Sequence, residues 1–176
     1  MDATEVPETC DVCGFAWDTV AAADIPTRLR AALDGYLAVL ASGDDSISVR
    51  PAPDVWSVME YCGHVRDVMF NLRDRIVLGL AEDHPTPKPM YQDVRIENGL
   101  YADDTPTAMA LELTAGIGLL AKAVAALDDA RLARTLVYGW PREADRSLAW
   151  VAAQAMHEAE HHLADVQAQC VPEVGQ

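Results

Sequence analysis

The hydrophobic positions along the chain follow a helical period. In four segments, apolar residues recur every three or four positions, as they do on the buried stripe of an amphipathic helix. No segment alternates apolar and polar residues over the length that a half-buried strand needs. The pattern therefore predicts an all-α protein.

Capping residues and helix breakers set the limits of the four predicted helices. Asp24 and Asp54 are candidate N-caps, and a proline lies close to each of them. Ser42 and Gly43 end the first helix, and Pro85 lies beyond the end of the second. The helices are expected from after Asp24 to Leu40, from after Asp54 to Leu80, from Pro106 to Leu127, and from Asp145 or Arg146 to about Cys170.

The segment 82–106 is too rich in proline to form a long helix, yet it is long enough to travel the length of a bundle. This predicts a four-helix bundle with a long crossover between the second and third helices. The expected organisation is an N-terminal tail at 1–24, the bundle at 25–170, and a C-terminal tail at 171–176.

The net charge and the length of the charge-free runs limit the classes of protein to which this chain can belong. The formal charge of −15, from 28 acidic and 13 basic residues, opposes binding to nucleic acid or to anionic lipid. The charge-free runs are shorter than the about 20 residues that cross a bilayer, and Met1 to Pro7 do not resemble a secretory signal. We therefore expect a cytoplasmic protein with reduced cysteines and with neither nucleic acid nor membrane as a partner.

Three histidines are candidate ligands of one divalent metal ion. His157 and His161 are four residues apart on the fourth helix and therefore share a face, whereas His162 points elsewhere. His64 lies midway along the second helix and would complete the site if the two helices are neighbours. Three imidazoles leave an open coordination position, although the spacing alone is equally consistent with solvated or core histidines.

Two motifs resemble those of the DinB-like superfamily. They are Trp56-Ser57-x-x-Glu60-x-x-x-His64 and His157-Glu158-x-x-His161-His162-Leu163-x-Asp165-Val166, and the similarity covers roughly 25–170. Members include bacillithiol and mycothiol S-transferases and the amino-terminal part of mycothiol-dependent maleylpyruvate isomerase. The resemblance implies a four-helix bundle, often dimeric, with zinc or nickel on His64, His157 and His161.

One departure limits what the resemblance implies. Many relatives carry a Gly-Gln pair just after the last histidines, where this chain has Ala164 and Asp165. The chain therefore looks closer to an actinobacterial branch with Leu-x-Asp-Ile or Leu-x-Asp-Val, and the identity of its thiol and of its substrate does not follow from the family.

The sequence His157-Glu158-Ala159-Glu160-His161 also matches the zinc motif of metalloproteases, in which the glutamate is the general base. That site needs a third ligand downstream, and a glycine and a histidine in the longer form of the motif. Ala164 and Gln167 occupy those two positions. The sequence therefore disfavours a protease.

Two further sets of residues are candidates for a role near the metal. Glu60, one turn before His64, is a candidate catalytic residue that orients His64 or accepts a proton; the alternative is a local cap or salt bridge. Asp165 has the same relation to His161. Cys10 and Cys13 form a C-x-x-C-G sequence that could make a second metal site with Cys170, His84 or His162, form a redox pair, or stay inert.

These observations favour a metal-dependent thiol S-transferase, with a low-molecular-weight thiol as co-substrate and an electrophilic small molecule as substrate. The alternatives are a non-catalytic, stress-linked metal-binding protein and a metal-hydroxide hydrolase. A homodimer is compatible with the resemblance. The sequence does not decide the metal, the thiol or the substrate.

Overall fold

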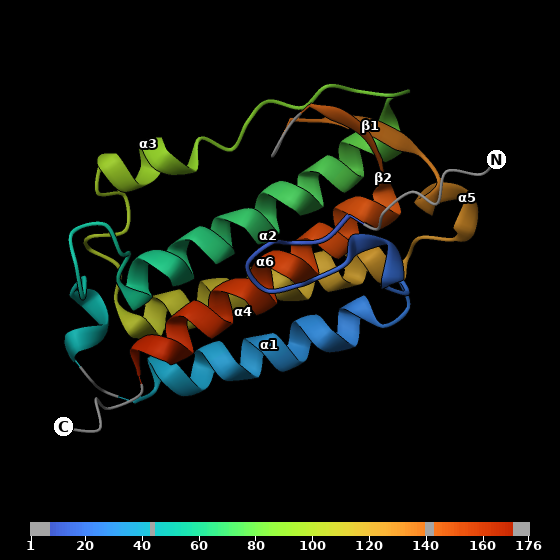
Figure 1. Cartoon of the computed structure of the whole chain (residues 1–176). Coiled ribbons are helices and arrows are strands. Elements are labelled where there is room, and N and C mark those ends of the chain that lie inside the picture. Colours follow the sequence, from blue (N-terminus) through green and yellow to red (C-terminus); the bar gives the residue numbers. More distant parts are fainter. Residues whose placement is uncertain (1–7, 43–44, 140–142, 171–176) are drawn as a thin grey trace.

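Four long helices pack into a bundle (Figure 1), as the hydrophobic period predicts. The computed structural model describes residues 8–42, 45–139 and 143–170. The expectations for 1–7 and for the C-terminal tail at 171–176 lie outside these residues. The helices of the bundle are α1 (Ile25–Leu40), α2 (Val58–Ala81), α4 (Pro106–Ala125) and α6 (Leu148–Gln169).

The helix order explains the long crossover. α4 and α6 each contact both α1 and α2, so that α1 lies diagonally opposite α2. α2 and α4 run in the same direction in Figure 1, and the chain must therefore return along the bundle between them. Residues 82–105 make this return, and they contain the short helix α3 (Gln92–Glu97). The predicted crossover is confirmed.

Helix starts follow local capping chemistry. Ser57, and not Asp54 as expected, is the N-cap of α2: its hydroxyl accepts a hydrogen bond from Glu60 N at 3.2 Å, and Glu60 Oε2 accepts one from Ser57 N at 2.8 Å. Asp24 occupies the predicted N-cap position of α1, but its side chain makes no capping hydrogen bond.

A small antiparallel sheet precedes α6 and was not expected from the sequence. β1 (Thr135–Tyr138) pairs with β2 (Ala144–Ser147), with Thr135 opposite Ser147. Each strand has four residues, too few to give a clear alternation of apolar and polar positions. The fourth helix therefore begins at Leu148 instead of Asp145 or Arg146. A short helix, α5 (Asp129–Leu132), and two 3-10 turns, η1 (Trp17–Thr19) and η2 (Asp45–Ser48), complete the elements.

α4 is the most apolar of the four long helices. In the described part of the chain it is the one helix whose length and composition would also suit a membrane span. Its buried residues include Met109, Leu113, Ile117 and Leu120, each fully buried in the bundle core. The apolar character of α4 is thus largely explained by its contacts with α1 and α2.

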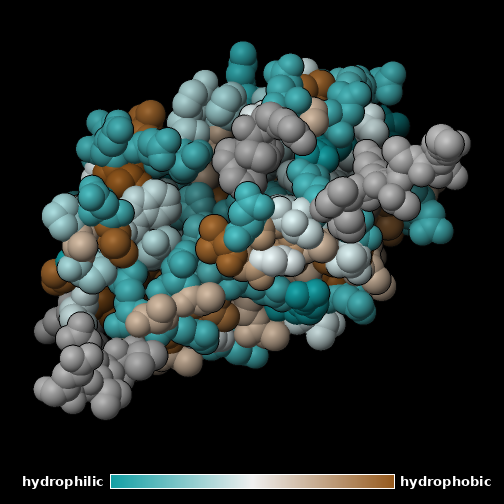
Figure 2. All heavy atoms as spheres, viewed as in Figure 1, coloured by the Kyte–Doolittle hydropathy of each residue, from teal (hydrophilic) through white to brown (hydrophobic). Residues whose placement is uncertain are grey.

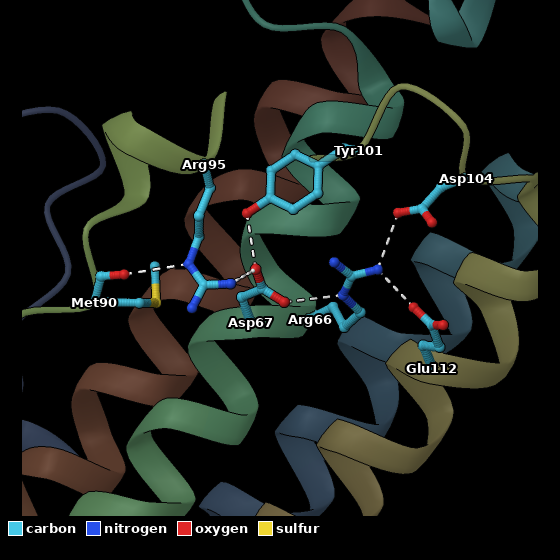
Figure 3. A network of polar contacts seen from close by, with 7 residues as sticks. All are labelled: Arg66, Asp67, Met90, Arg95, Tyr101, Asp104 and Glu112. Carbon is cyan, nitrogen blue, oxygen red and sulfur yellow. Dashed lines mark hydrogen bonds and ion pairs between the residues drawn. The ribbon is translucent and has the colours of Figure 1, made fainter. Parts of the chain in front are cut away.

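A polar network holds the crossover against α2 (Figure 3). Asp67 Oδ2 accepts hydrogen bonds from Arg95 Nη1 at 2.6 Å and from the Tyr101 hydroxyl at 2.9 Å. Arg66 extends the network to α4 through Glu112, at 2.5 Å. The ring of Tyr101 lies so close to Gly63 that a Cβ there would be 2.8 Å from it. The crossover therefore has a defined position over α2.

The segment 8–24 crosses α6 (Figure 1) and is fastened to it at two points. Trp17, which is 7% exposed, donates a hydrogen bond from Nε1 to Gln154 Oε1 at 2.7 Å. Glu8 accepts hydrogen bonds from Arg146 at 2.6 Å and from Trp150 Nε1 at 3.2 Å. On this face, Figure 2 shows mostly hydrophilic residues, with the hydrophobic ones in small separate groups.

Candidate metal centre

α6 presents potential metal ligands on two adjacent faces. Successive residues of an α-helix are rotated by about 100°, and residues four apart return to nearly the same face. His157 and His161 share the face beneath the N-terminal segment, where the rings of Phe15 and Trp17 pack against His157. Glu158 and His162 share the next face, toward α2. One helix therefore contributes to two adjacent groups, which meet where His161, His162 and Asp165 also bring their ligand atoms within 4.8 Å of one another.

The first group, here called the pocket cluster, consists of His64, Glu158 and His162. Glu158 Oε2 lies 3.2 Å from His64 Nε2 and 3.3 Å from His162 Nε2. The three side chains each offer a ligand atom, and these atoms lie within 4.8 Å of one another. The packing of α2 against α6 brings the group together from positions 94 residues apart.

Neighbouring side chains orient two members of the pocket cluster. Glu158 Oε1 accepts a hydrogen bond from Gln154 Nε2 at 2.6 Å, and Gln154 in turn accepts the hydrogen bond from Trp17. His162 Nδ1 lies 2.9 Å from Asp165 Oδ2, which leaves Nε2 facing Glu158. A carboxylate on the far nitrogen of a histidine is a common support for a metal ligand.

The electrostatics of the pocket cluster favour a negative carboxylate. Burial raises the pKa of Glu158, but its contacts with His162 and His64 lower it more, so that the pKa lies well below its ordinary value. Burial lowers the pKa of His162, but Glu158 and then Asp165 outweigh this effect and raise it. The cluster therefore presents an anionic carboxylate oxygen between His64 and His162, and a bound cation would take the place of the proton that Glu158 and Asp165 stabilise on His162.

The pocket cluster opens into a cavity of about 400 Å³. This volume lies within the range of about 300 to 1,000 Å³ that is typical of small-molecule sites. The crossover covers one side of the cavity with Pro87, Pro89 and Met90, and α2 contributes Arg75. The bundle therefore provides a partly open space next to the three ligand atoms.

The pocket cluster fits a divalent ion of the zinc type. Two imidazoles and one carboxylate are a donor set found at reactive zinc sites, where a fourth position stays open. His64 Nδ1 is buried without a hydrogen-bond partner in the described structure, and His64 Nε2 faces Glu158. The donor types, their spacing and the adjoining cavity are all those of an open site.

The second group, here called the N-terminal cluster, consists of Cys10, Cys13, His157 and His161. Their ligand atoms also lie within 4.8 Å of one another. His157 is 4% exposed, and burial lowers its pKa, which favours the neutral imidazole. Neither of its ring nitrogens has a hydrogen-bond partner among the described residues.

The structure does not bring the three predicted histidine ligands together. His64 lies in the pocket cluster, whereas His157 and His161 lie in the N-terminal cluster, and no group of candidate ligands among the described residues contains all three. The difference is one residue on α6, which corresponds to about 100° of rotation. Glu158 and His162 were missed, although they show the same four-residue spacing as His157 and His161.

Glu60 lies away from the pocket cluster, in the first turn of α2. It forms the capping box with Ser57, and its Oε1 accepts a hydrogen bond from Arg50 Nη2 at 2.6 Å. Burial raises the pKa of Glu60, but Arg50 and the capping contacts lower it below its usual value. Glu60 does not line the cavity. The contacts of this side chain are those of a local cap and salt bridge.

Solved structures share the fold of this chain. One is described as "YfiT from Bacillus subtilis is a probable metal-dependent hydrolase with an unusual four-helix bundle topology"; it has a TM-score of 0.77 and 15% identity, over 93% of this chain and 90% of that one. The mycothiol-dependent maleylpyruvate isomerase has a TM-score of 0.66 and 15% identity, and its histidine-to-alanine variant 0.68 and 13%. This chain covers 62% of each isomerase chain, and 85% of this chain is matched.

Sequence comparison identifies the family. The search among curated proteins gives no match. The profile of the DinB superfamily matches residues 26–166, which include all four long helices up to Val166 and both members of each α6 pair. The chain belongs to the DinB superfamily.

Proposed function

We propose that the protein binds a divalent metal ion, zinc or nickel, at His64, Glu158 and His162 and acts as a metal-dependent thiol S-transferase on an electrophilic small molecule. One observation carries the proposal: the three ligand atoms face a partly open cavity of about 400 Å³. Such a site has room for both a metal ion and a small molecule.

Each supporting residue has a definite task in this proposal. When bound, the ion lowers the pKa of a thiol that reaches its open position and so makes it nucleophilic at neutral pH. Gln154 holds Glu158 through its 2.6 Å hydrogen bond, and Asp165 holds His162. The crossover lines one side of the space next to the reacting groups with Pro87 and Pro89.

The surroundings of Arg75 favour an anionic substrate. It lines the cavity, is 8% exposed, and forms no ion pair within the described residues. Its Nη2 donates to Lys88 O at 3.1 Å, its guanidinium lies over the Tyr138 ring at 4.5 Å, and its Nε has no partner among the described residues. A buried cation with unused hydrogen-bonding capacity favours a carboxylate or a similar anion.

A metal-dependent hydrolase is the second candidate. The same open position admits water as well as a thiol, and one solved structure with a TM-score of 0.77 is described as a probable metal-dependent hydrolase. A non-catalytic metal-binding protein fits less well, because such a role needs a closed coordination sphere and the pocket cluster adjoins a cavity.

Cobalt substitution tests the proposal. We expect mycothiol, bacillithiol or glutathione to change the visible spectrum of the cobalt-loaded protein, and we expect thiol addition to a haloarene electrophile. The variant His64→Ala should lose both responses. His84→Ala is the matched control, because His84 pairs with Asp145 outside both clusters. If no thiol changes the spectrum, the transferase is excluded, and turnover of esters or amides then supports the hydrolase.

A further inference from the structure

The N-terminal cluster combines residues that the proposed function does not use. Cys10 and Cys13 lie outside the residues matched by the DinB profile, whereas His157 and His161 lie within them. The pocket cluster draws its ligands from the adjacent face of α6 and needs none of these four. The four side chains therefore require an explanation of their own.

The cysteines sit in a turn of the type that binds metals. Gly14 N donates to Cys10 O at 2.8 Å, Cys10 N donates to Phe15 O at 2.8 Å, and Thr9 pairs with Ala16. Gly14 has φ of 72°, a left-handed conformation that glycine adopts without strain. A tight C-x-x-C-G turn of this kind directs both thiols to one side of the loop.

Two histidines of α6 provide the other two candidate ligands. His157 and His161 lie one turn apart on α6, and both nitrogens of the buried His157 and Nδ1 of His161 lack hydrogen-bond partners in the described structure. Buried polar atoms without partners are rare in native proteins and often mark a missing ion or water. Here the thiols of Cys10 and Cys13 lie within 4.8 Å of the available nitrogens.

The turn reaches this position through contacts that do not involve the cysteines. The hydrogen bonds of Trp17 to Gln154 and of Glu8 to Arg146 lie on either side of the turn in sequence. The Trp17 ring lies 4.7 Å from the His157 ring, and the Phe15 ring 5.2 Å from it. These aromatic rings cover His157, whereas Cys13 lies on the exposed side of the cluster.

We propose that Cys10, Cys13, His157 and His161 bind a second, structural metal ion of the zinc type, which fastens the N-terminal segment to α6. A tetrahedral zinc ion separates sulfur and nitrogen ligands by about 3.3 to 3.8 Å, so that small side-chain movements complete the site. Two thiolates neutralise the dication, and soft ligands select zinc over magnesium or calcium. All four coordination positions come from the protein, in contrast to the pocket cluster.

Metal content measured on the full chain, purified under reducing conditions, tests this site. We expect the Cys10→Ser, Cys13→Ser double variant to hold one ion fewer per chain than the wild type. Cys170→Ser, at the far end of α6, serves as the matched control and should keep the wild-type content. Equal metal content in the wild type and the double variant would overturn the proposal.

Two further readouts separate this site from the pocket cluster. Cobalt bound to the wild type and to a His64→Ala, His162→Ala variant should show thiolate-to-cobalt charge-transfer absorption, and the cysteine double variant should not. Absence of this absorption from both the wild type and the His64→Ala, His162→Ala variant would exclude the N-terminal site. That result would not depend on whether the pocket cluster binds metal. We also expect a chelator to be needed before iodoacetamide labels Cys13. Rapid labelling of Cys13 in the metal-loaded protein, or a Cys10–Cys13 disulfide in it, would contradict the proposal.

Discussion

The pocket cluster and the N-terminal cluster are built from the same short stretch of α6, yet they differ in almost every chemical respect. The pocket cluster has two imidazoles and a carboxylate and adjoins a cavity. The N-terminal cluster has two thiols and two imidazoles, and aromatic rings cover its buried histidine, His157. What covers a helix face, rather than the helix itself, decides whether its ligands meet a small molecule.

The comparison also shows how the two clusters are connected. Trp17 packs against His157 of the N-terminal cluster and donates a hydrogen bond to Gln154, which donates one to Glu158 of the pocket cluster. The N-terminal segment thereby reaches the ligand set of the pocket through two hydrogen bonds. Variants in each cluster should nevertheless have distinct primary effects, because the ligand atoms are not shared.

Loss of a pocket ligand should have the largest effect. We expect His162→Ala to abolish the thiol response of the cobalt-loaded protein. Loss of a residue that only supports a ligand typically lowers activity by about 10- to 100-fold, and loss of His162 itself should lower it by more. His161→Ala, one residue away, should keep the thiol response. The opposite ranking, measured by kcat/KM and by thiol titration, would mean that the clusters have been assigned the wrong roles.

Disruption of the N-terminal cluster should mainly reduce stability. Its metal ion links residues about 150 positions apart, and a link across such a long loop contributes on the order of 2 to 4 kcal/mol. The Cys10→Ser, Cys13→Ser variant should therefore melt at a lower temperature, by roughly 2 to 4 °C for each kcal/mol. Calorimetry with and without a chelator checks this. An unchanged Tm would show that the N-terminal segment is held by its hydrogen bonds alone.

Asp165→Asn should have an intermediate effect, mainly on the pocket cluster, because Asp165 Oδ2 lies 2.9 Å from His162 Nδ1 and 3.8 Å from His161 Nε2. Asp165 holds His162 Nδ1 at 2.9 Å, and removal of such support costs about 10- to 100-fold in metal affinity. Competition with a chromogenic chelator measures the affinity of the pocket ion in the cysteine double variant, where it is the one ion that the two proposals predict. An unaltered affinity would remove Asp165 from the positioning residues.

Glu60 should show the smallest effect, limited to stability. Loss of a helix cap costs about 0.5 to 2 kcal/mol, so Glu60→Ala should destabilise the protein at neutral pH without altering the thiol response. Because the folded pKa of Glu60 is lowered, its contribution is complete above the unfolded pKa and is lost as the pH falls through the folded value. Urea unfolding should show the two proteins converging in acid.

Glu60→Gln distinguishes the cap from a catalytic role. Glutamine can keep the capping hydrogen bond to Ser57 N, and it should retain more of the stability than alanine. A variant that is as stable as the wild type but inactive with thiol would restore the catalytic assignment of Glu60.

The hydrophobic period predicted the bundle and its crossover because a helix stripe repeats over many turns, so that small local errors average out. The prediction of a site does not benefit from such averaging, because it depends on a few individual residues. The choice between His161 and His162 depends on a single residue, and the orientation of α6 is fixed by packing against α2. Both four-residue pairs are visible in the sequence, but only the neighbouring elements show which pair faces which partner.

The sequence could not predict the partners of Cys10 and Cys13, for a different reason. The sequence left Cys170, His84 and His162 open as companions, whereas the structure brings the turn to His157 and His161. The position of the turn depends on Trp17 and Glu8, whose contacts with Gln154 of α6 and Arg146 of β2 lie more than 130 residues away along the chain. No local pattern encodes a pairing at that separation.

The parallel course of α2 and α4 has a consequence for how such proteins diversify. A return segment is unavoidable in this topology, and here it happens to form a wall of the cavity through Pro87, Pro89 and Met90. Loops tolerate substitution and insertion better than the helices they join. Substrate preference can therefore change over evolutionary time by exchange of this one connection, while the helices that supply the ion's ligands remain untouched.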